Sequence, residues 1–208
     1  YRTLKNELLQ NSAIKEVSAA NYMPGSNIFS DMGFYTEGGN MDKAVLVFRN
    51  SVDLGYQELL GIKMLAGRSF TDNRAMDGNN KLVLNRTSAK ELGFEPEKAV
   101  GQNLFFDWQR QKYSFQVIGV MEDYHQISLK ETIKPTLFFM PQSDSSFSFM
   151  IASVKAEDFD GTIKTIVGTW KKLVNDTPFE YTFLDENIQS QYNEDKKVST
   201  IISSFTFI

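Results

Sequence analysis

Apolar residues recur every three or four positions in two stretches of the chain, which is the spacing of one face of a helix. The first stretch covers residues 1–11. The second covers residues 160–174, where Asp160 is a candidate N-cap, and it predicts the clearest helix of the sequence. A polar helix is also expected from about residue 185, and it runs into an apolar end at 201–208.

Most other apolar residues alternate with polar ones or form short runs, which is typical of strands. Strands are predicted over residues 14–20, 44–52, 82–84, 104–108, 113–121, 136–140, 147–154 and 179–183. The polar linker Gln109-Arg110-Gln111 joins two of these strands into a hairpin. Residues 25–42 are expected to form a long polar loop that holds a short strand around Phe34-Tyr35.

Two short helices are expected to follow buried strands. Asp53 is a candidate N-cap for a helix that carries Tyr56 and ends at Gly61. Asn85 is a candidate N-cap for a second helix, which ends at Gly93. Both predictions rest on a short polar side chain before an apolar turn and a glycine after it.

Many strands and few helices, without regular alternation, predict an α+β fold. The middle of the chain, residues 54–143, is denser in turns and aromatic strands than either end. We therefore predict a β-rich subdomain inserted into an α/β subdomain that is formed by residues 1–53 and 144–190. Residues 191–208 would then form a stalk that leaves this second subdomain.

Composition narrows the classes of function. The chain has 208 residues, of which 41% are hydrophobic and 23% are charged, so it is long enough and apolar enough to bury a core. Its net charge is -4 and it has no basic stripe, which excludes nucleic acid as a partner. It has no Cys, which excludes disulfides, thiolate catalysis and the common structural zinc sites.

Candidate chemistry is sparse. His125 is the only histidine, and although Glu122 and Asp123 make a carboxylate-histidine cluster conceivable, it is best interpreted as a loop or strand-end residue that makes ordinary hydrogen bonds. Asp72 and Asp77 lie in a loop rich in Asn, but their spacing does not match a calcium loop, so a solvated loop is expected. The chain has no nucleophile elbow and no Gly-rich phosphate loop. We therefore predict that it is not an enzyme and has no catalytic, cofactor-binding or metal-binding residue.

Several motifs resemble, in order, those of the MacB-like periplasmic core domain of FtsX-type ABC transporter permeases. They are Val52-Asp53-Leu54-Gly55-Tyr56 running to Gly61-Ile62, Gly67-Arg68-Ser69-Phe70, Leu82-Val83-Leu84-Asn85 with Ala89 and Leu92-Gly93, Ala99-Val100-Gly101-Gln102, Val117-Ile118-Gly119-Val120 running to Asp123-Tyr124-His125, and Ile133-Lys134-Pro135. The matched motifs span about residues 52–140. Their glycines suit turns and helix ends, so the motifs are interpreted as structural.

The resemblance implies a domain that stands outside the inner membrane, on the periplasmic side, between the first two transmembrane helices of a permease. The terminal α/β subdomain would be porter-like, and residues 1–11 and about 185–208 would be ends of stalks. The implied partners are the permease's own transmembrane segments and a cytoplasmic ABC ATPase. A second permease copy, giving a dimer, and a periplasmic adaptor or substrate are further partners that the resemblance allows.

The function implied is to couple ATP-driven motion of the membrane part to substrate export or to a periplasmic partner. One alternative is a free extracytoplasmic module that binds a peptide or glycan on aromatic strands. Another is a hydrolase with a carboxylate pair that includes Glu122 or Asp123. The apolar run at 201–208 favours the permease, because a secreted module has no use for it.

Overall fold

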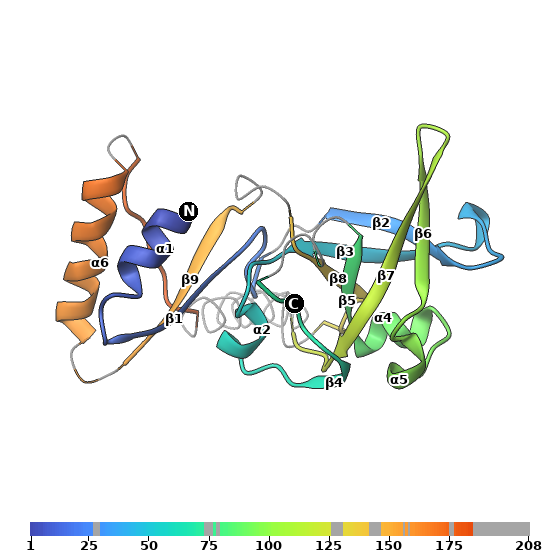
Figure 1. Ribbon diagram of the computed structural model, residues 1–208, viewed down its shortest axis with the longest axis horizontal. Helices are drawn as coiled ribbons and strands as arrows, with labels where there is room; N and C mark the ends of the chain where they lie inside the picture. The colour runs from blue at the N-terminus through green and yellow to red at the C-terminus, as the bar shows by residue number, and fades with distance from the viewer. Residues whose placement is uncertain are drawn as a thin grey trace, which may run out of the picture.

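The computed structural model describes residues 1–26, 30–72, 77, 80–125, 131–141, 147–155, 157, 159–174 and 177–184. Its strands form two sheets, one of two strands and one of seven (Figure 1). No helix among these described residues is long and apolar enough to cross a membrane.

The smaller sheet lies under two helices at one end of the molecule (Figure 1). We call this part the two-stranded unit; its elements are α1 (Arg2–Leu8), β1 (Ile14–Ala20), β9 (Phe149–Val154) and α6 (Phe159–Leu173). β1 and β9 pair antiparallel although more than a hundred residues separate them, with Val17 opposite Ala152. Leu4, Leu8 and Val17 are buried here, and Trp170 and other partly buried apolar residues of α6 pack against them, so the amphipathic helices cover one face of the sheet.

The larger sheet, which we call the strand-rich body, has the order β4-β7-β5-β8-β3-β2-β6. Its strands are β2 (Ser30–Thr36), β3 (Val45–Ser51), β4 (Met64–Gly67), β5 (Lys81–Asn85), β6 (Asn103–Trp108), β7 (Gln111–Met121) and β8 (Thr136–Phe139). Three short helices accompany it: α2 (Tyr56–Leu59), α4 (Arg86–Glu91) and α5 (Pro96–Ala99), and a 3-10 turn, η1 (Met41–Lys43), precedes β3.

Strand β7 pairs with strands at both ends of the sheet, so the pairing within the body forms a closed ring. Its first half pairs with β6, from Gln111 to Gln116, and its second half pairs with β5 and β4. At 11 residues it is about 36 Å long, which is enough to reach both ends of the sheet. The largest buried cluster lies among these strands and helices α4 and α5; it includes Phe34, Val47, Leu82, Leu84, Leu104, Val117, Val120 and Leu137.

Two glycines permit the closest approach between β4 and β7. Gly67 has a φ of +68°, and a Cβ at this position would overlap the carbonyl oxygen of Ile118. A Cβ at Gly119 would overlap the carbonyl oxygen of Arg68. Any side chain at Gly67 or Gly119 would therefore push the two strands apart. The family-like motifs Gly67-Arg68 and Ile118-Gly119 are thus the two sides of one contact.

Most of the predicted elements are present. The two helices of the two-stranded unit, the hairpin and the strands up to residue 154 lie close to their expected ranges. Asn85 does cap α4, since its side chain accepts a hydrogen bond from the backbone N–H of Ser88 at 2.9 Å. The expected short strand around Phe34-Tyr35 is longer than predicted, because β2 begins at Ser30.

Three local predictions were wrong. Asp53 does not cap α2, whose N-cap is Gly55 without a side-chain hydrogen bond. Asp160 lies inside the first turn of α6, which begins one residue earlier at Phe159. Residues 179–183 form no strand; their aromatic rings pack on one another and on α6, with Phe179 5.7 Å from Trp170 between ring centroids. The alternation of aromatic residues predicted a strand, but in the structure their rings pack against α6 and no strand forms.

The sheet pairing differs from the predicted division of the chain at one place. β2 and β3, which lie within the predicted segment 1–53, pair in the strand-rich body and not with β1 or β9. The bounds of the two predicted subdomains therefore stay a prediction. The helix expected from residue 185, and the stalk at 191–208, lie outside the described residues.

Candidate functional site

The side chain of Asp53 joins helix α1 to the segment that leaves β3 of the strand-rich body. Only 5% of this residue is exposed. Its Oδ2 accepts a hydrogen bond from the hydroxyl of Tyr1 at 2.6 Å and one from Nζ of Lys5 at 2.7 Å. Lys5 lies on α1, and Tyr1 is its N-cap residue. Charge-assisted hydrogen bonds to a buried carboxylate are among the stronger polar contacts in proteins, so α1 is held firmly at this point.

The main chain of Asp53 is also held, on the side of strand β1. Its backbone N–H donates to the carbonyl of Ala19 at 2.9 Å, and its carbonyl accepts from the hydroxyl of Ser18. One residue earlier, Val52 forms an isolated antiparallel bridge with Ala20. The segment that leaves β3 is therefore fastened to β1 by its backbone and to α1 by one carboxylate. We call this set of contacts the Asp53 joint.

A buried amide strengthens the same connection. Asn50 is 1% exposed. Its side chain accepts from the backbone N–H of Tyr22 at 3.0 Å and donates to the carbonyl of Tyr22 at 2.9 Å. Asn21 donates its backbone N–H to the carbonyl of Ser51. The end of β3 thus runs along the chain that leaves β1, and relative movement at this place would break several buried hydrogen bonds.

Electrostatics fixes the charge state of the joint. Burial raises the pKa of Asp53, but the hydrogen bonds from Lys5 and Tyr1 outweigh it, and the net pKa lies below the ordinary value. Nearby, burial and then the charge of Glu58 raise the pKa of Glu16, with Lys5 acting in the opposite sense. Lys5 therefore lowers the pKa of two carboxylates, those of Asp53 and Glu16, and Asp53 is ionised at neutral pH.

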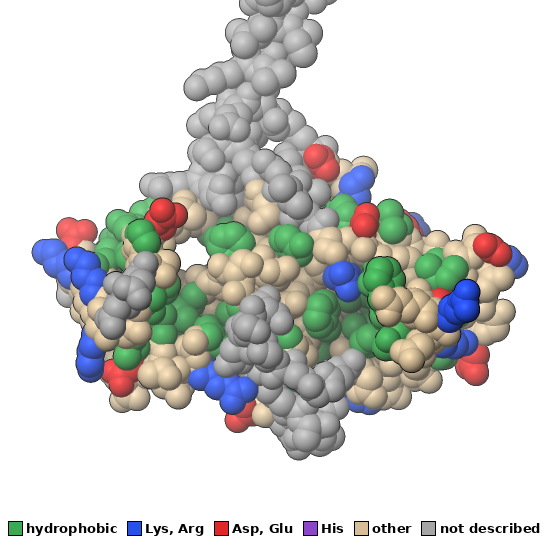
Figure 2. All heavy atoms as spheres, turned by 90° about the horizontal axis from the view of Figure 1, so that it is seen from above, with side chains coloured by type: hydrophobic (Ala, Val, Ile, Leu, Met, Phe, Trp, Pro, Cys, Tyr) green, Lys and Arg blue, Asp and Glu red, His purple; other side chains and the backbone are tan. Residues whose placement is uncertain are grey.

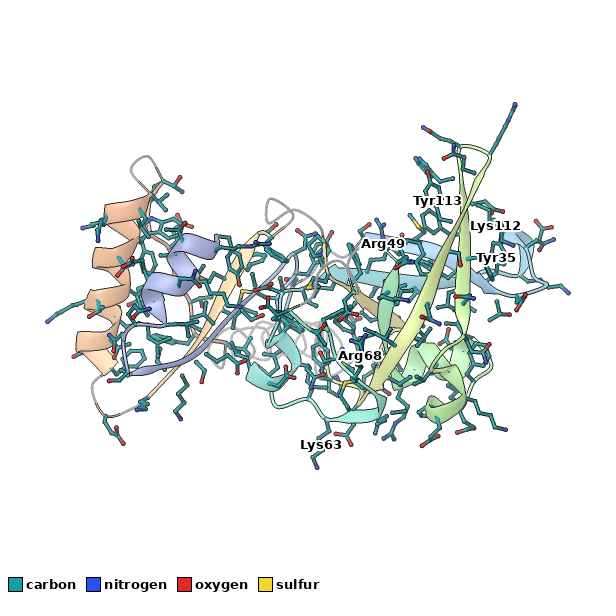
Figure 3. The ribbon with its side chains drawn as sticks, viewed as in Figure 1. Tyr35, Arg49, Lys63, Arg68, Lys112 and Tyr113 are labelled. Atoms are coloured by element: carbon teal, nitrogen blue, oxygen red, sulfur yellow. The ribbon has the colours of Figure 1, made fainter. Side chains whose placement is uncertain are left out.

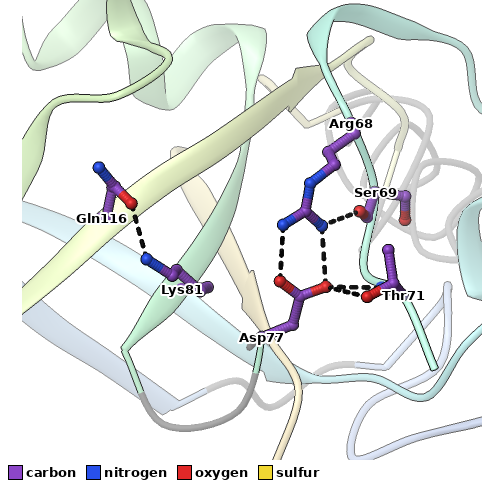
Figure 4. Close-up of polar contacts among 6 residues, drawn as sticks. All are labelled: Arg68, Ser69, Thr71, Asp77, Lys81 and Gln116. Carbon is purple, nitrogen blue, oxygen red and sulfur yellow. Dashed lines mark hydrogen bonds and ion pairs between the residues drawn. The ribbon is translucent and has the colours of Figure 1, made fainter. Parts of the chain in front are cut away.

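The Gly-Arg turn, by contrast, stabilises its own loop. Arg68 donates two hydrogen bonds to the carboxylate of Asp77, at 2.8 and 2.7 Å (Figure 4). Thr71 adds two more, from its backbone N–H and its hydroxyl. Asp77 is fully buried, so the expectation of a solvated loop was wrong at this residue. The bonds from Arg68, opposed by burial and aided by Thr71, lower the pKa of Asp77 to about 2.

The other polar motif residues also have structural partners. Asn85 accepts from the backbone N–H of Thr136 at 2.9 Å and donates to the carbonyl of Lys134 at 3.0 Å. Asp123 accepts from the backbone N–H and from the hydroxyl of Thr87, at 3.0 and 2.9 Å, and so holds the start of α4. These motif residues thus connect segments far apart in sequence.

The structure gives little support to hydrolytic chemistry at Glu122 or Asp123. Both oxygens of Asp123 are occupied by Thr87, and Glu122 lies 4.0 Å from Arg86 across an exposed surface. His125 is exposed. In the part of the chain that the structure describes, no three His, Cys, Asp or Glu side chains gather as metal ligands would.

A groove lies between α1, β9 and α6, with a volume of about 460 Å³. Its walls are mainly apolar and include Leu4, Met150, Trp170 and Leu173. A second cavity, near Tyr56 and Phe70, holds only about 10 Å³. The groove therefore has room for a large apolar side chain or a stretch of chain, and the second cavity does not.

The family follows from comparison with known proteins. The model of the MacB-like periplasmic core domain matches residues 2–167, which is most of the chain. The chain belongs to this family. The match extends beyond the motifs at 52–140 on both sides, so the resemblance expected from those motifs is confirmed.

This MacB-like domain is similar to part of the uncharacterized ABC transporter permease YknZ of Bacillus subtilis (strain 168). The two are 28% identical over 130 residues, which cover 61% of this chain but only 31% of that permease. The chain thus corresponds to about a third of this relative.

Solved structures agree on the fold. The periplasmic region of MacB from Actinobacillus actinomycetemcomitans is 19% identical, with a TM-score of 0.58, over 83% of this chain and 73% of that one. The extracellular domain of the transporter YknZ from Gram-positive bacteria is 18% identical, with a TM-score of 0.55, over 82% and 81%. A domain of a putative permease from Porphyromonas gingivalis gives a TM-score of 0.54 at 12% identity, over 85% and 83%. The α+β class with a sheet-dominated body is therefore confirmed.

Sequence reasoning singled out Asp53 but gave it the wrong role. Its partners on α1 precede it by 48 and 52 residues, a separation at which no local pattern applies. The only signal available was that Asp53 opens the first family-like motif. The contact between Arg68 and Asp77 had a weaker signal still, because Asp77 stands among other polar residues in its loop.

Proposed function

We propose that this MacB-like domain is the extracytoplasmic part of an inner-membrane ABC transporter permease. In this proposal it couples ATP-driven motion of the membrane part to substrate export or to a periplasmic partner, without catalysis of its own. The observation that carries the proposal is the Asp53 joint. It ties the helix that would continue into the membrane to the body that would meet a substrate or partner.

The joint suits the transmission of movement because it combines backbone and side-chain contacts. Asp53 is hydrogen-bonded to β1 through its main chain and to α1 through its carboxylate. A shift of α1 would then move the two-stranded unit and the body together, as a rigid body, instead of bending the chain between them. A small displacement of α1 at the membrane would then produce a matching displacement of the strand-rich body.

The proposal includes the partners that such a permease needs. These are its own transmembrane segments and a cytoplasmic ABC ATPase, with a second permease copy and a periplasmic adaptor as further partners. Because the matched stretch is only 31% of the relative YknZ, the activity of the whole protein is inferred from the family and from the joint.

Distance measurements in the full-length permease with its ATPase test the coupling. Spin labels are attached to cysteines introduced at two exposed positions, Asn6 on α1 and Lys98 on α5, in a variant without other cysteines. We expect this distance to keep one narrow distribution with and without ATP, while the distance from Lys98 to a label in the membrane part changes. Asp53→Asn should broaden the first distribution and reduce the ATP-dependent change in the second.

The matched control is Asp42→Asn, at an exposed carboxylate on η1 far from the joint, and it should change neither distribution. An Asp53→Asn permease in which both distances behave as in the unaltered protein would contradict the proposed role of the joint. A permease whose body does not move with ATP at all would contradict the proposed function itself.

A free peptide-binding or glycan-binding module is the second candidate. The apolar groove of about 460 Å³ favours it, since a module that works by binding needs such a surface. The sequence of the gene on either side of this segment distinguishes the two candidate functions. Apolar stretches of about 20 codons on both sides of this segment support the permease, whereas polar flanks after a cleavable signal support the free module.

A further inference from the structure

The hairpin of β6 and β7 projects from the body at the end farther from α1 (Figure 1). Its strands pair from Asn103 opposite Gln116 up to Trp108 opposite Gln111. The turn consists of Gln109 and Arg110, which have φ values of 49° and 64°. Glycine or asparagine normally occupies such left-handed positions. The hairpin therefore keeps its tight, projecting shape without the residues that form it most easily.

One face of the hairpin is a continuous aromatic stripe. The ring of Phe106 stacks on that of Tyr113, with centroids 4.9 Å apart and planes at 12°, and lies 5.7 Å from that of Phe115. Phe106 also meets Phe34 of the core, edge to face, at 5.5 Å. By strand alternation, Trp108 falls on the same face as Phe106. The stripe begins in the core and becomes exposed outward, to 38% at Tyr113 and 58% at Trp108.

On the opposite face of the hairpin the side chains contact one another and Tyr35 of β2, which closes that face. The hydroxyl of Tyr35 donates to Asp107 at 2.8 Å, and the ring of Tyr35 stacks on that of Phe105. Nζ of Lys112 lies over the ring of Phe105, 4.1 Å from its centroid. Tyr113 and Lys112 point to opposite sides of the hairpin (Figure 3). The apolar surface is therefore one-sided and held in place by stacking, so a ligand would meet it preformed.

The charge of the projecting part is opposite to that of the chain. Residues 103–116 include Arg110, Lys112 and one acidic residue, Asp107, a net charge of +1 (two basic less one acidic), whereas the whole chain has a net charge of -4. Asp107 lies on the closed face, where Tyr35 donates to it, and Arg110 lies in the turn. Seen from above, hydrophobic side chains lie beside basic and acidic ones at the end of the molecule that holds the hairpin (Figure 2). This combination is complementary to a ligand that has carboxylates beside an apolar side chain.

The hairpin also has a free strand edge. From Gln111 to Phe115, β7 pairs with β6 on one side, and none of the described strands pairs with its other side. An extended peptide can add to such an edge through main-chain hydrogen bonds. A membrane surface would meet the tip from all sides, and a one-sided stripe beside an open edge fits it poorly. The occupant that these features favour is thus a segment of protein.

We propose that the aromatic face of the β6–β7 hairpin, formed by Phe106, Trp108 and Tyr113, docks an extended acidic segment of a partner protein. Trp108 is the anchor, Arg110 in the turn contacts a carboxylate of the partner, and the open edge of β7 receives its backbone. The proposal rests on the proposed function only in needing the domain to be exposed outside the membrane.

Selection from a displayed library of short random peptides tests the docking, with the full-length permease in detergent as the target. We expect the selected peptides to share an Asp or Glu residue close to one aromatic or aliphatic residue. A synthetic peptide of that sequence should bind about 30-fold more weakly to Trp108→Ser, the loss typical of an interface hot spot. Binding to Arg110→Glu should also weaken, and binding to the unaltered permease should fall with added salt.

The control is Leu46→Ser, which removes a side chain of similar exposure, 61% against 58% for Trp108, from β3. It should leave peptide binding unchanged. Selected peptides without acidic residues, or with equal affinity for the Trp108→Ser permease, would overturn the proposal. So would binding of the permease to vesicles of phosphatidylglycerol and phosphatidylcholine that is lost in Trp108→Ser while no peptide is selected. None of these outcomes depends on ATP-driven movement, so the coupling at Asp53 is tested separately.

Discussion

The guanidinium of Arg68 and the carboxylate of Asp77 form a two-bonded ion pair in which Asp77 is fully buried and Arg68 is 42% exposed. Thr71 gives the same carboxylate two more hydrogen bonds, so its contacts with the described residues come from the segment after β4. The pair ties Asp77 to the segment that directly follows β4. The Gly-Arg motif is thus explained by stability, since Gly67 allows the strand contact and Arg68 secures the loop after β4.

Asp77→Asn should destabilise the domain by about 2 to 3 kcal/mol, because an amide cannot accept from Arg68 and Thr71 in the same way at a buried position. Urea denaturation of the purified domain measures this loss. Asp72→Asn, at an exposed carboxylate in the same loop, is the control and should change the free energy of unfolding by less than about 0.5 kcal/mol. Equal effects of the two substitutions would contradict the assigned role of Asp77.

The same carboxylate predicts how stability depends on pH. The pKa of Asp77 is about 2 in the folded protein, against an ordinary value of 3.8. The folded state therefore favours the ionised form, and the resulting stability is present above about pH 4 and is lost as pH falls from 3.8 toward 2. The difference is about 2 kcal/mol. Unfolding measured across this range should show a smaller loss for Asp77→Asn; an unchanged loss would show that other carboxylates, such as Asp53, account for it.

Gly119→Ala should destabilise the domain by about 1 to 3 kcal/mol, because the new methyl group would overlap the carbonyl of Arg68 and force β4 away from β7. Gly168→Ala is the matched control. Gly168 lies in α6 with open space around it, so alanine there should stabilise the domain by about 0.5 to 1 kcal/mol through helix propensity. Thermal unfolding shows whether each variant is more or less stable than the unaltered domain. A stabilising Gly119→Ala would refute the close contact.

Asn85→Ala should cost about 2 to 4 kcal/mol, because it leaves the backbone N–H groups of Ser88 and Thr136 without their acceptor at buried positions. Asn40→Ala is a control of the same chemistry at an exposed cap, where only the N–H of Asp42 loses its partner, and it should cost under about 1 kcal/mol. Chemical denaturation measures both. A cost at Asn85 no greater than that at Asn40 would mean that the link to Thr136 contributes nothing.

The sequence by itself determined what depends on neighbours in the chain. The stripe of α6, the alternation in β7 and the cap at Asn85 are local patterns, because a helix or strand face repeats every few residues and a cap acts within one turn. The ordered motifs between residues 52 and 140 were enough to indicate the family. They did not show what each polar residue of a motif contacts.

Tertiary structure alone decided the contacts between distant segments. Asp53 takes its partners from α1, about 50 residues away, and so became part of a joint instead of a helix cap. The aromatic residues 179–183 packed on α6 instead of forming a strand, since side-chain contacts across the fold outweigh local preference. Likewise, β6 extends beyond its pairing with β2, which ends at Phe105, and so exposes Trp108 on a projecting hairpin. Such placements depend on how the chain closes over long separations, which local spacing does not encode.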